Sequence, residues 1–191
     1  MAKSENNEVM YGARGRVGNL VIFKNFGNGK TIISKIPRKK DNPTYSVDQQ
    51  VAKERFKEGV LYAKGAASDP ILSAFYKPFT KTGTSVYNMA LADFCRPPEI
   101  KSIDTQQYQG NVGDLITIKA IDSFKVVEVL VIISKPDGTL IETGTAVQAL
   151  NSLNWIYTAT VANTPTASTL IKARATDMPG NLTELEETVL L

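Results

Sequence analysis

Two adjacent prolines, Pro97 and Pro98, interrupt this chain of 191 residues near its midpoint. Proline fixes its own φ angle, lacks a backbone N–H and disfavours helix in the preceding residue, so a regular helix does not continue through this point. Before the pair the apolar residues recur with the period of helices, and after it they alternate as in β-strands. We therefore predict two domains, one at residues 1–96 and one at residues 97–191.

The sign of the charge changes at the same place. Residues 1–96 contain 16 Lys and Arg and 8 Asp and Glu, a balance of +8, whereas residues 97–191 contain 6 and 11, a balance of −5. The net charge of +3 hides this division. Opposite charges on two parts of one chain favour association with a partner or with another copy of the chain.

A β-hairpin is predicted near the N-terminus. Residues 19–26 and 30–36 are rich in β-branched and aromatic side chains, and Gly27-Asn28-Gly29 between them suits a tight turn. The same stretch contains GNGKT, which looks like the end of a phosphate-binding loop. That loop requires a glycine at the position of Lys24 and a helix after it, whereas Ile32-Ile33 favours a strand. We therefore predict a hairpin turn here rather than a nucleotide site.

About three helices should follow the hairpin, which makes the first domain α+β. Ser46 and Gln49 fit a capping box at the start of a long helix. Residues 70–79 and 85–94 have the pattern of two further helices, and Pro78 should kink or end the first of them. We expect these apolar residues of the long helix to form its buried stripe: Val47, Val51, Phe56, Val60 and Ala63.

The first domain resembles a family of uncharacterised bacterial proteins. The resemblance rests on "GARGRVGNLVIFKNFGNGKTIISKIP" and "NPTYSVDQQVAKERF", which correspond to a G-x-x-G-x-V-G-N hairpin and an N-P-x-T-x-x-Q helix. It implies the hairpin–helix fold and no particular activity. The matching positions are Gly15, Val17, Gly18, Asn19, Pro43, Gln49, Arg55 and Phe56.

Basic residues cluster in the hairpin and at its exit. A patch of this kind neutralises phosphates on DNA or RNA, or binds an acidic protein surface, which includes the acidic half of another copy. Lysines at strand edges also serve only to prevent edge-to-edge pairing. The sequence leaves these three interpretations open. The candidate binding patch is Arg14, Arg16, Lys35, Arg38, Lys39 and Lys40.

The second domain has the pattern of an all-β sandwich of the immunoglobulin or fibronectin-III kind, with Trp155 in its core. Seven short β-rich runs are separated by turn signals such as KPDGT and DMPGN. In addition, "NWIYTATV" and "IKARATDMPGNLTELE" resemble the last strands of bacterial Ig-like modules, which occur in adhesins and phage structural proteins. The predicted strands are residues 99–103, 114–121, 125–134, 139–144, 154–162, 168–177 and 182–190.

The residue inventory argues against most enzyme chemistry. The chain has no histidine, which excludes His-dependent nucleophilic sites and His-ligated zinc. Its one cysteine, Cys95, is expected to be a buried structural thiol. Asp114, Asp122 and Asp177 lie near predicted strand ends, where calcium is an alternative, but no acidic loop motif surrounds them. We therefore predict no catalytic residues, no cofactor and no metal.

Together these features predict a non-enzymatic structural or assembly protein. The basic domain would anchor it to a protein partner or to other copies, and the Ig-like domain would be a spacer or adhesive module. A nucleic-acid-binding protein that uses the basic hairpin exit is the alternative. No secretory signal or membrane span is visible, so we expect synthesis in the cytoplasm and no membrane insertion, with a virus-like or phage particle as one setting.

Overall fold

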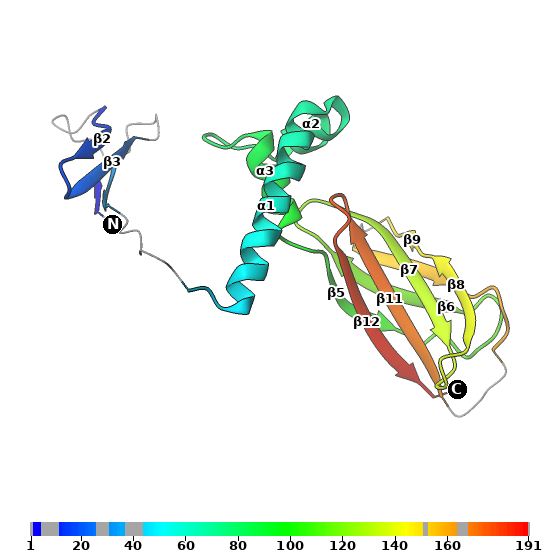
Figure 1. Ribbon diagram of the computed structural model, residues 1–191. Helices are drawn as coiled ribbons and strands as arrows, with labels where there is room; N and C mark the ends of the chain where they lie inside the picture. Colours follow the sequence, from blue (N-terminus) through cyan, green and yellow to red (C-terminus); the bar gives the residue numbers. More distant parts are fainter. Residues whose placement is uncertain are drawn as a thin grey trace. The chain divides into compact units, whose positions relative to one another are not determined.

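The computed structural model describes residues 2–4, 12–25, 31–36, 44–150, 153–163 and 168–190 (Figure 1). The chain combines helices with antiparallel sheets and is mostly β. It divides into two compact units, Met1–Glu54 with Lys81–Ser85, and Arg55–Thr80 with Val86–Leu191. The domain boundary near residue 97 stays a prediction, because compactness does not report which segments fold independently. No described helix has both the length and the apolar character needed to cross a membrane.

The first unit contains a four-stranded antiparallel sheet. Its strand order is β1 (Ala2–Ser4), β4 (Thr31–Lys35), β3 (Val21–Asn25) and β2 (Gly15–Val17). The pairing of β3 with β4 confirms the predicted hairpin, while its Gly27-Asn28-Gly29 turn lies outside the described residues. The lead-in strand β2 pairs with β3, and the tight link between them uses Gly18 at a φ of 55°, which favours glycine.

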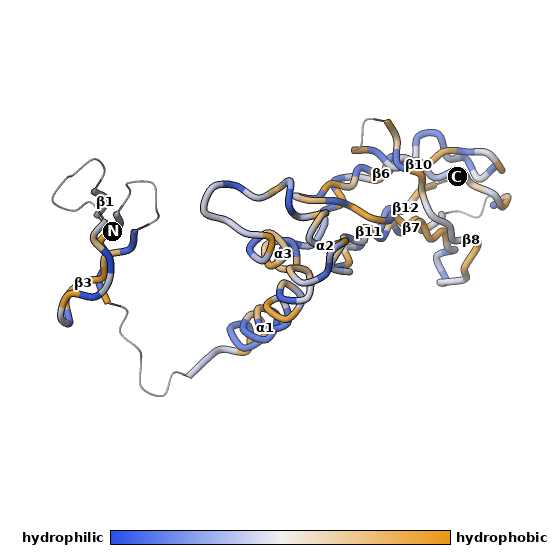
Figure 2. The backbone as a smooth tube through the Cα atoms, turned by 90° about the horizontal axis from the view of Figure 1, so that it is seen from above, coloured by the Kyte–Doolittle hydropathy of each residue, from blue (hydrophilic) through white to orange (hydrophobic). Residues whose placement is uncertain are grey.

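The pairing register of this sheet makes its two faces different. Val17 pairs with Val21, and Phe23 pairs with Ile33, so these four apolar residues share one face. Arg16 pairs with Ile22 and belongs to the other face. Strand β3 itself begins with three hydrophobic residues and ends with two hydrophilic ones, which the colours of Figure 2 follow.

Helix α1 (Val47–Ser68) begins at the predicted capping box. The backbone N–H of Gln49 donates to Ser46 Oγ at 3.3 Å, and the Ser46 N–H donates to Gln49 Oε1 at 3.2 Å. These reciprocal bonds satisfy donors that the first helical turn leaves unpaired.

The predicted apolar stripe of α1 is wrong in its first half. Val47, Val51 and Phe56 are exposed, with fractions of 74%, 58% and 53%. The buried residues of α1 are instead small: Gly59, Ala63 and Ala66. Small side chains let other helices approach closely. The face of α1 that is buried is therefore the one with small residues, not the one with large apolar residues.

Two short helices complete the helical part. Asp69 caps α2 (Pro70–Tyr76) by accepting from the N–H groups of Ile71 at 2.9 Å and Leu72 at 2.8 Å. The 3-10 turn η2 (Lys77–Phe79) follows, and α3 spans Val86–Phe94. Both predicted helices are therefore confirmed, and Pro78 lies in the 3-10 turn that follows α2. Their buried cluster is Ala63, Ala66, Tyr76 and Ala90, against which Phe124 and Met178 pack.

Two glycines of α1 provide a matched test of this close packing. A Cβ at Gly59 would lie 2.9 Å from Phe94 Cδ1 and 3.0 Å from Leu91 Cδ1, whereas a Cβ at Gly65 would meet nothing within 4 Å. We expect Gly65→Ala to stabilise the protein by about 1 kcal/mol through helix propensity. In Gly59→Ala the added methyl group overpacks the contact with α3, which typically costs about 1–3 kcal/mol and should cancel the gain from helix propensity. Urea unfolding checks both, and equal stabilisation would contradict the packing.

The rest of the second unit is a β-sandwich of two antiparallel sheets, and all seven predicted strands are present. Strand β9 was not predicted, because two residues are too few to give an alternating pattern. One sheet has the order β5 (Glu99–Asp104), β6 (Leu115–Ile121), β10 (Asn154–Thr158), β9 (Val147–Gln148). The other has the order β12 (Leu182–Val189), β11 (Thr169–Asp177), β7 (Val126–Ser134), β8 (Leu140–Thr145).

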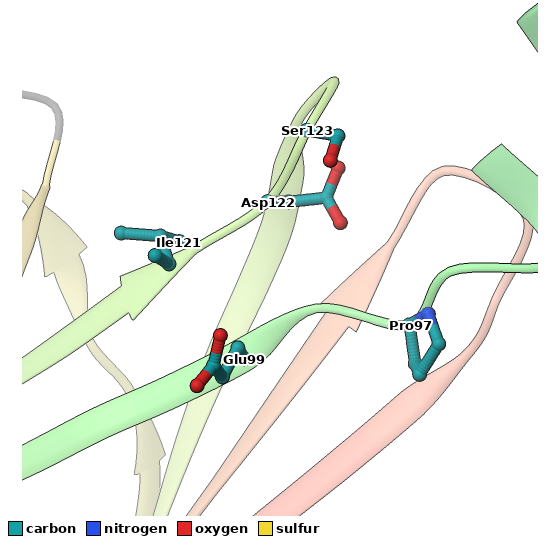
Figure 3. Close-up of a pocket in the computed structure, with 5 residues that line it drawn as sticks. All are labelled: Pro97, Glu99, Ile121, Asp122 and Ser123. Atoms are coloured by element: carbon teal, nitrogen blue, oxygen red, sulfur yellow. The ribbon is translucent and has the colours of Figure 1, made fainter. Parts of the chain in front are cut away.

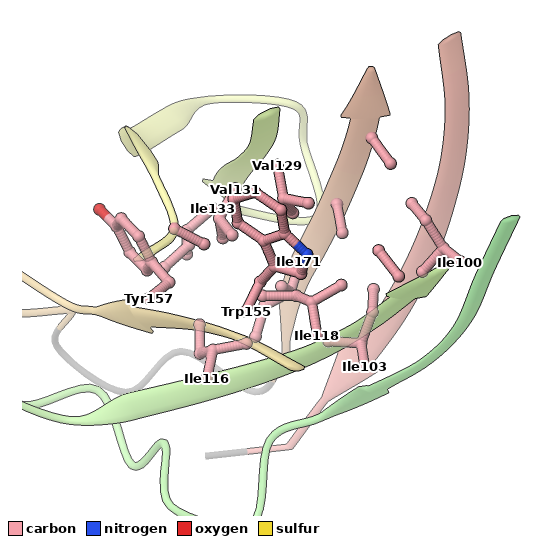
Figure 4. Packing of buried hydrophobic residues seen from close by; sticks show 14 of the residues in the cluster. Ile100, Ile103, Ile116, Ile118, Val129, Val131, Ile133, Trp155, Tyr157 and Ile171 are labelled. Carbon is pink, nitrogen blue, oxygen red and sulfur yellow. The ribbon is translucent and has the colours of Figure 1, made fainter. Parts of the chain in front are cut away.

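The inward-facing side chains of both sheets form one hydrophobic core (Figure 4). Strand β11 alternates buried with half-buried residues along its whole length, as expected for a strand with one face in the core. Trp155 is 6% exposed, which confirms its predicted place. Its Nε1 makes no hydrogen bond with the described residues, so burial of the ring rather than polar pairing holds it there.

A buried carboxylate, Glu142 on β8, ties the segment after β10 to the opposite sheet. Its Oε2 accepts from the Tyr157 hydroxyl at 3.0 Å and from the Thr160 hydroxyl at 2.8 Å. It also accepts from the backbone N–H groups of Thr160 at 3.0 Å and Val161 at 3.2 Å. A single oxygen of Glu142 therefore accepts hydrogen bonds from four donors, and Glu142 itself is only 6% exposed.

Candidate functional site

The structure describes half of the predicted basic patch. Arg14, Arg16 and Lys35 are exposed, while Arg38, Lys39 and Lys40 lie outside the described residues. The Arg16 Nε donates to the Gly18 carbonyl at 2.8 Å, and its Nη2 donates to Asn19 Oδ1. Lys35 pairs with Val21, so its register position is on the apolar face, opposite to Arg16. The register therefore does not bring Arg16 and Lys35 onto one surface.

Three carboxylates, Asp93, Asp122 and Asp177, meet in the second unit. One oxygen from each lies within 4.8 Å of the others. Asp93 comes from the last turn of α3, Asp122 follows β6, and Asp177 ends β11. Segments far apart in the sequence thus bring three carboxylates together.

Asp114, which the sequence grouped with Asp122 and Asp177, lies elsewhere. It precedes β6 and Asp122 follows it, and a seven-residue strand is about 23 Å long. Asp114 Oδ2 instead accepts from the N–H groups of Gln109 at 2.7 Å and Asn111 at 2.8 Å. The backbone bond from Asn111, and then that from Gln109, hold the pKa of Asp114 below its ordinary value. Its role is to order the loop before β6.

Asp93 is the most enclosed member of the three-carboxylate cluster, with an exposed fraction of 0%. Its Oδ2 accepts from the Tyr76 hydroxyl at 2.6 Å, and the Tyr76 oxygen lies 2.8 Å from the Tyr62 hydroxyl. Because a phenol has one proton, Tyr62 donates to Tyr76 when Tyr76 donates to Asp93. The other oxygen, Asp93 Oδ1, is buried and has no hydrogen-bond partner among the described residues.

The surroundings disfavour the ionised form of Asp93. Burial raises the pKa of Asp93 to about 7, the hydrogen bond from Tyr76 lowers it, and the charges of Asp122 and Asp177 raise it. Burial, followed by the hydrogen bond to Asp93, also raises the pKa of Tyr76 far above its ordinary value. The tyrosine therefore remains a neutral donor to the carboxyl group.

Asp177 is fixed by the turn between β11 and β12. Its Oδ1 accepts from the Asn181 N–H at 2.6 Å, and its Oδ2 accepts from Asn181 Nδ2 at 2.7 Å. The same amide donates to the Phe94 carbonyl at 3.2 Å, so Asn181 joins the turn to the end of α3. Burial raises the pKa of Asp177, while the bonds from Asn181 lower it and the charge of Asp122 raises it.

Asp122 is half-buried and connects the cluster with solvent. Its Oδ1 accepts from the N–H groups of Phe124 at 2.6 Å and Lys125 at 3.0 Å, which closes the loop between β6 and β7. Asp122 also lines a pocket of about 180 Å³ with Ser123 beside it and Glu99 on the neighbouring strand β5 (Figure 3). Asp122 is the member of the cluster that lines this pocket.

Sequence reasoning missed Asp93, although a signal was present. Asp93 falls three residues after Ala90 on the apolar stripe of α3, and it lies in the last helical turn, where a negative charge opposes the helix dipole. Asp177 similarly occupies the inward phase of β11 with Ala173 and Ala175. Acidic residues at inward positions of two elements indicate a shared polar site. The expectation for Cys95 was wrong, because this thiol is exposed just beyond α3.

Comparisons with known proteins identify no family. No family model and no curated protein matches the chain. CopC from Methylosinus trichosporium OB3b is 14% identical over 48% of this chain and 89% of that chain, with a TM-score of 0.36. An engineered protein is 18% identical over 64% of this chain and 28% of that chain, with a TM-score of 0.37. Likenesses this weak support no conclusion, and the predicted resemblance to bacterial families stays a prediction.

Proposed function

We propose that this protein is a non-enzymatic assembly protein with a basic anchoring unit and an Ig-like spacer module. The strand order of the sandwich supports the Ig-like assignment. Lettered A, B, C, C′, D, E, F and G along the chain, strands β5 to β12 give sheets ABED and GFCC′. Immunoglobulin domains have the sheets ABED and CFG, with C′ added to the second in variable-type domains. This fold serves many roles, so the anchor carries the functional argument.

The observation that carries the assembly role is the open apolar face of the N-terminal sheet. Val17 is 54% exposed, and Val21, Phe23 and Ile33 on the same face are only half-buried. Nearby in the sequence, Leu20 is 77% exposed. Contiguous apolar surface of this kind marks a protein contact in soluble proteins. The face therefore presents an apolar surface to a binding partner.

A second copy of the chain is the partner that the charges favour. Residues 1–96 have a balance of +8 and residues 97–191 a balance of −5. On the edge strand β12, Glu184 and Glu186 pair with Arg174 and Lys172 of the same sheet, while Glu187 is exposed and makes none of the ion pairs among the described residues. Complementary charges on different parts of one chain favour a head-to-tail contact, which generates rings or filaments. An acidic strand also prevents the edge-to-edge pairing that an uncharged β12 would invite.

Light scattering of the purified chain tests this proposal. We expect a mass above the monomer's 20.8 kDa that rises with protein concentration. Val17→Lys, which places a charge on the apolar face, should return the protein to a monomer. Lys24→Gln, an exposed position on the opposite face, is the matched control and should leave the mass unchanged. A monomer at every concentration, or an equal effect of both variants, would overturn the proposal.

Nucleic-acid binding is the second candidate, and the exposure of Arg14 and Arg16 favours it. The two readouts that separate it from assembly are the 260/280 nm absorbance ratio and the salt dependence of binding to DNA or RNA. Phosphate contacts weaken steeply with salt and equally for all sequences. Replacing Arg14 and Arg16 by glutamine should then flatten the salt slope. Purified protein with no nucleic acid and no salt-dependent binding would remove this candidate.

A further inference from the structure

We propose that Asp93, Asp122 and Asp177 bind one divalent cation, and that Ca²⁺ is the ion that fits. This inference is independent of the assembly role, because it concerns only residues of the second unit. The three side chains form a site whose ligand atoms are all carboxylate oxygens. Hard cations such as Ca²⁺ prefer oxygen ligands, whereas zinc and copper sites rely on histidine and cysteine.

The spacing of the oxygens is compatible with one bound Ca²⁺. No two of the three ligand oxygens are more than 4.8 Å apart. Because Ca²⁺–oxygen distances are about 2.3–2.6 Å, two ligands on opposite sides of the ion are about 4.6–5.2 Å apart. For Mg²⁺ the corresponding separation is about 4.0–4.2 Å. An upper limit of 4.8 Å is compatible with Ca²⁺. The preference for Ca²⁺ rests on the three carboxylates, because Mg²⁺ usually takes only one or two carboxylates and keeps several waters.

The unpaired oxygen of Asp93 is the second and independent sign of a ligand. Asp93 Oδ1 is fully buried and accepts no hydrogen bond from the described residues. Among the described residues, Asp93, Asp122 and Asp177 make no ion pair with a basic side chain. A buried carboxylate is costly unless it is paired or coordinates a metal. A bound cation supplies the charge partner that the Asp93 carboxylate lacks and offsets the repulsion among the three negative groups.

The neighbouring groups hold the three ligands in place and leave a route for the ion. Tyr76 fixes the carboxyl group of Asp93 by its 2.6 Å hydrogen bond, and Asn181 fixes both oxygens of Asp177. Asp122 lies at the wall of the pocket in Figure 3, so the proposed site meets solvent at this ligand. Ca²⁺ takes six to eight oxygen ligands, so water must contribute several of them.

Binding at this site would connect three elements of the second unit. Asp93 belongs to α3, Asp122 to the loop between β6 and β7, and Asp177 to the end of β11. The turn after β11 already contacts the end of α3 through the bonds of Asn181 to the carbonyls of Asp93 and Phe94. A cation adds a bond between α3 and the sandwich that depends on the Ca²⁺ concentration. The site therefore makes the rigidity of this joint dependent on calcium.

Thermal unfolding of the full chain during a Ca²⁺ titration tests the inference. After chelator treatment, we expect the Tm to rise with Ca²⁺ concentration, because an ion that binds only the folded state stabilises it. Asp93→Asn keeps the size of the side chain and an acceptor for Tyr76, and should weaken Ca²⁺ binding at least about tenfold, as should Asp177→Asn. Asp114→Asn is the matched control outside the cluster and should keep the full response.

Terbium luminescence provides a readout that does not depend on stability. Tb³⁺ replaces Ca²⁺ at oxygen sites and is excited through nearby aromatic rings, here Tyr76 and Tyr62. We expect luminescence that Ca²⁺ displaces in the wild type and that is lost in Asp93→Asn. A Tm unaffected by Ca²⁺, or the same loss in Asp114→Asn as in Asp93→Asn, would overturn the site. An equal response to Mg²⁺ would overturn the assignment to Ca²⁺.

Discussion

Glu142→Ala is expected to lower the free energy of unfolding by about 2–4 kcal/mol, because it leaves the buried Tyr157 hydroxyl and three partly buried donors without their acceptor. The single oxygen Oε2 serves the Tyr157 hydroxyl, the Thr160 hydroxyl and N–H, and the Val161 N–H. An unsatisfied buried donor costs about 1–3 kcal/mol, and the truncated side chain adds a cavity. Chemical denaturation at neutral pH measures the change.

Two further variants separate the lost acceptor from the lost charge. Glu142→Gln keeps a carbonyl oxygen that accepts the same hydrogen bonds, so it should cost much less than the alanine variant. Glu187→Ala removes a carboxylate that is exposed on β12 and should change stability by less than about 0.5 kcal/mol. If the free energies of unfolding of Glu142→Ala and Glu187→Ala differ by less than about 1 kcal/mol, the hydrogen bonds to Glu142 do not hold the segment after β10.

Asp93→Asn is expected to stabilise the chelator-treated protein above pH 7 and to have little effect near pH 4. The pKa of Asp93 is about 7 in the folded protein, against an ordinary value of 3.8. Between these values the folded protein holds a proton that the unfolded chain releases, so stability falls as the pH rises. The loss is complete above pH 7 and is on the order of 4 kcal/mol for a carboxyl group with no exposed surface.

The groups around Asp93 support this sign. Tyr62 of α1 and Tyr76 of α2 are neutral at these pH values, because burial raises the pKa of both. Asp122 and Asp177 are the charged neighbours, and both oppose ionisation of Asp93. Asparagine does not titrate, so the variant does not lose stability as the pH rises through the pKa of Asp93.

Comparison of the two proteins by urea unfolding from pH 4 to pH 8.5 isolates the contribution of Asp93. Asp114→Asn serves as a control of opposite sign. Backbone hydrogen bonds from Asn111 and then Gln109 lower the pKa of Asp114, so its ionised form stabilises the fold above the ordinary carboxyl range. That variant should therefore destabilise the protein at neutral pH. A difference between wild type and Asp93→Asn that does not change with pH would refute the raised pKa.

The strands and helix starts could be predicted because their signals are local. Alternating β-rich runs located seven strands of the sandwich, and the capping residue Ser46 marked the start of the long helix. The buried face of α1 could not be predicted from hydrophobicity, because it consists of Gly59, Ala63 and Ala66. Which side of a helix is buried depends on how closely its neighbours approach, and side-chain size alone does not report that distance.

The sequence by itself determined the change from helices to strands at Pro97-Pro98, the hairpin of β3 and β4 and the place of Trp155 in the core. It did so because periodicity, proline geometry and turn chemistry act over a few residues. Only the tertiary structure brought Asp93 next to Asp122 and Asp177, from positions up to 84 residues apart in the chain. It also separated Asp114 from Asp122 by the length of β6. A cluster made by packing depends on distances through space, which no short stretch of sequence contains.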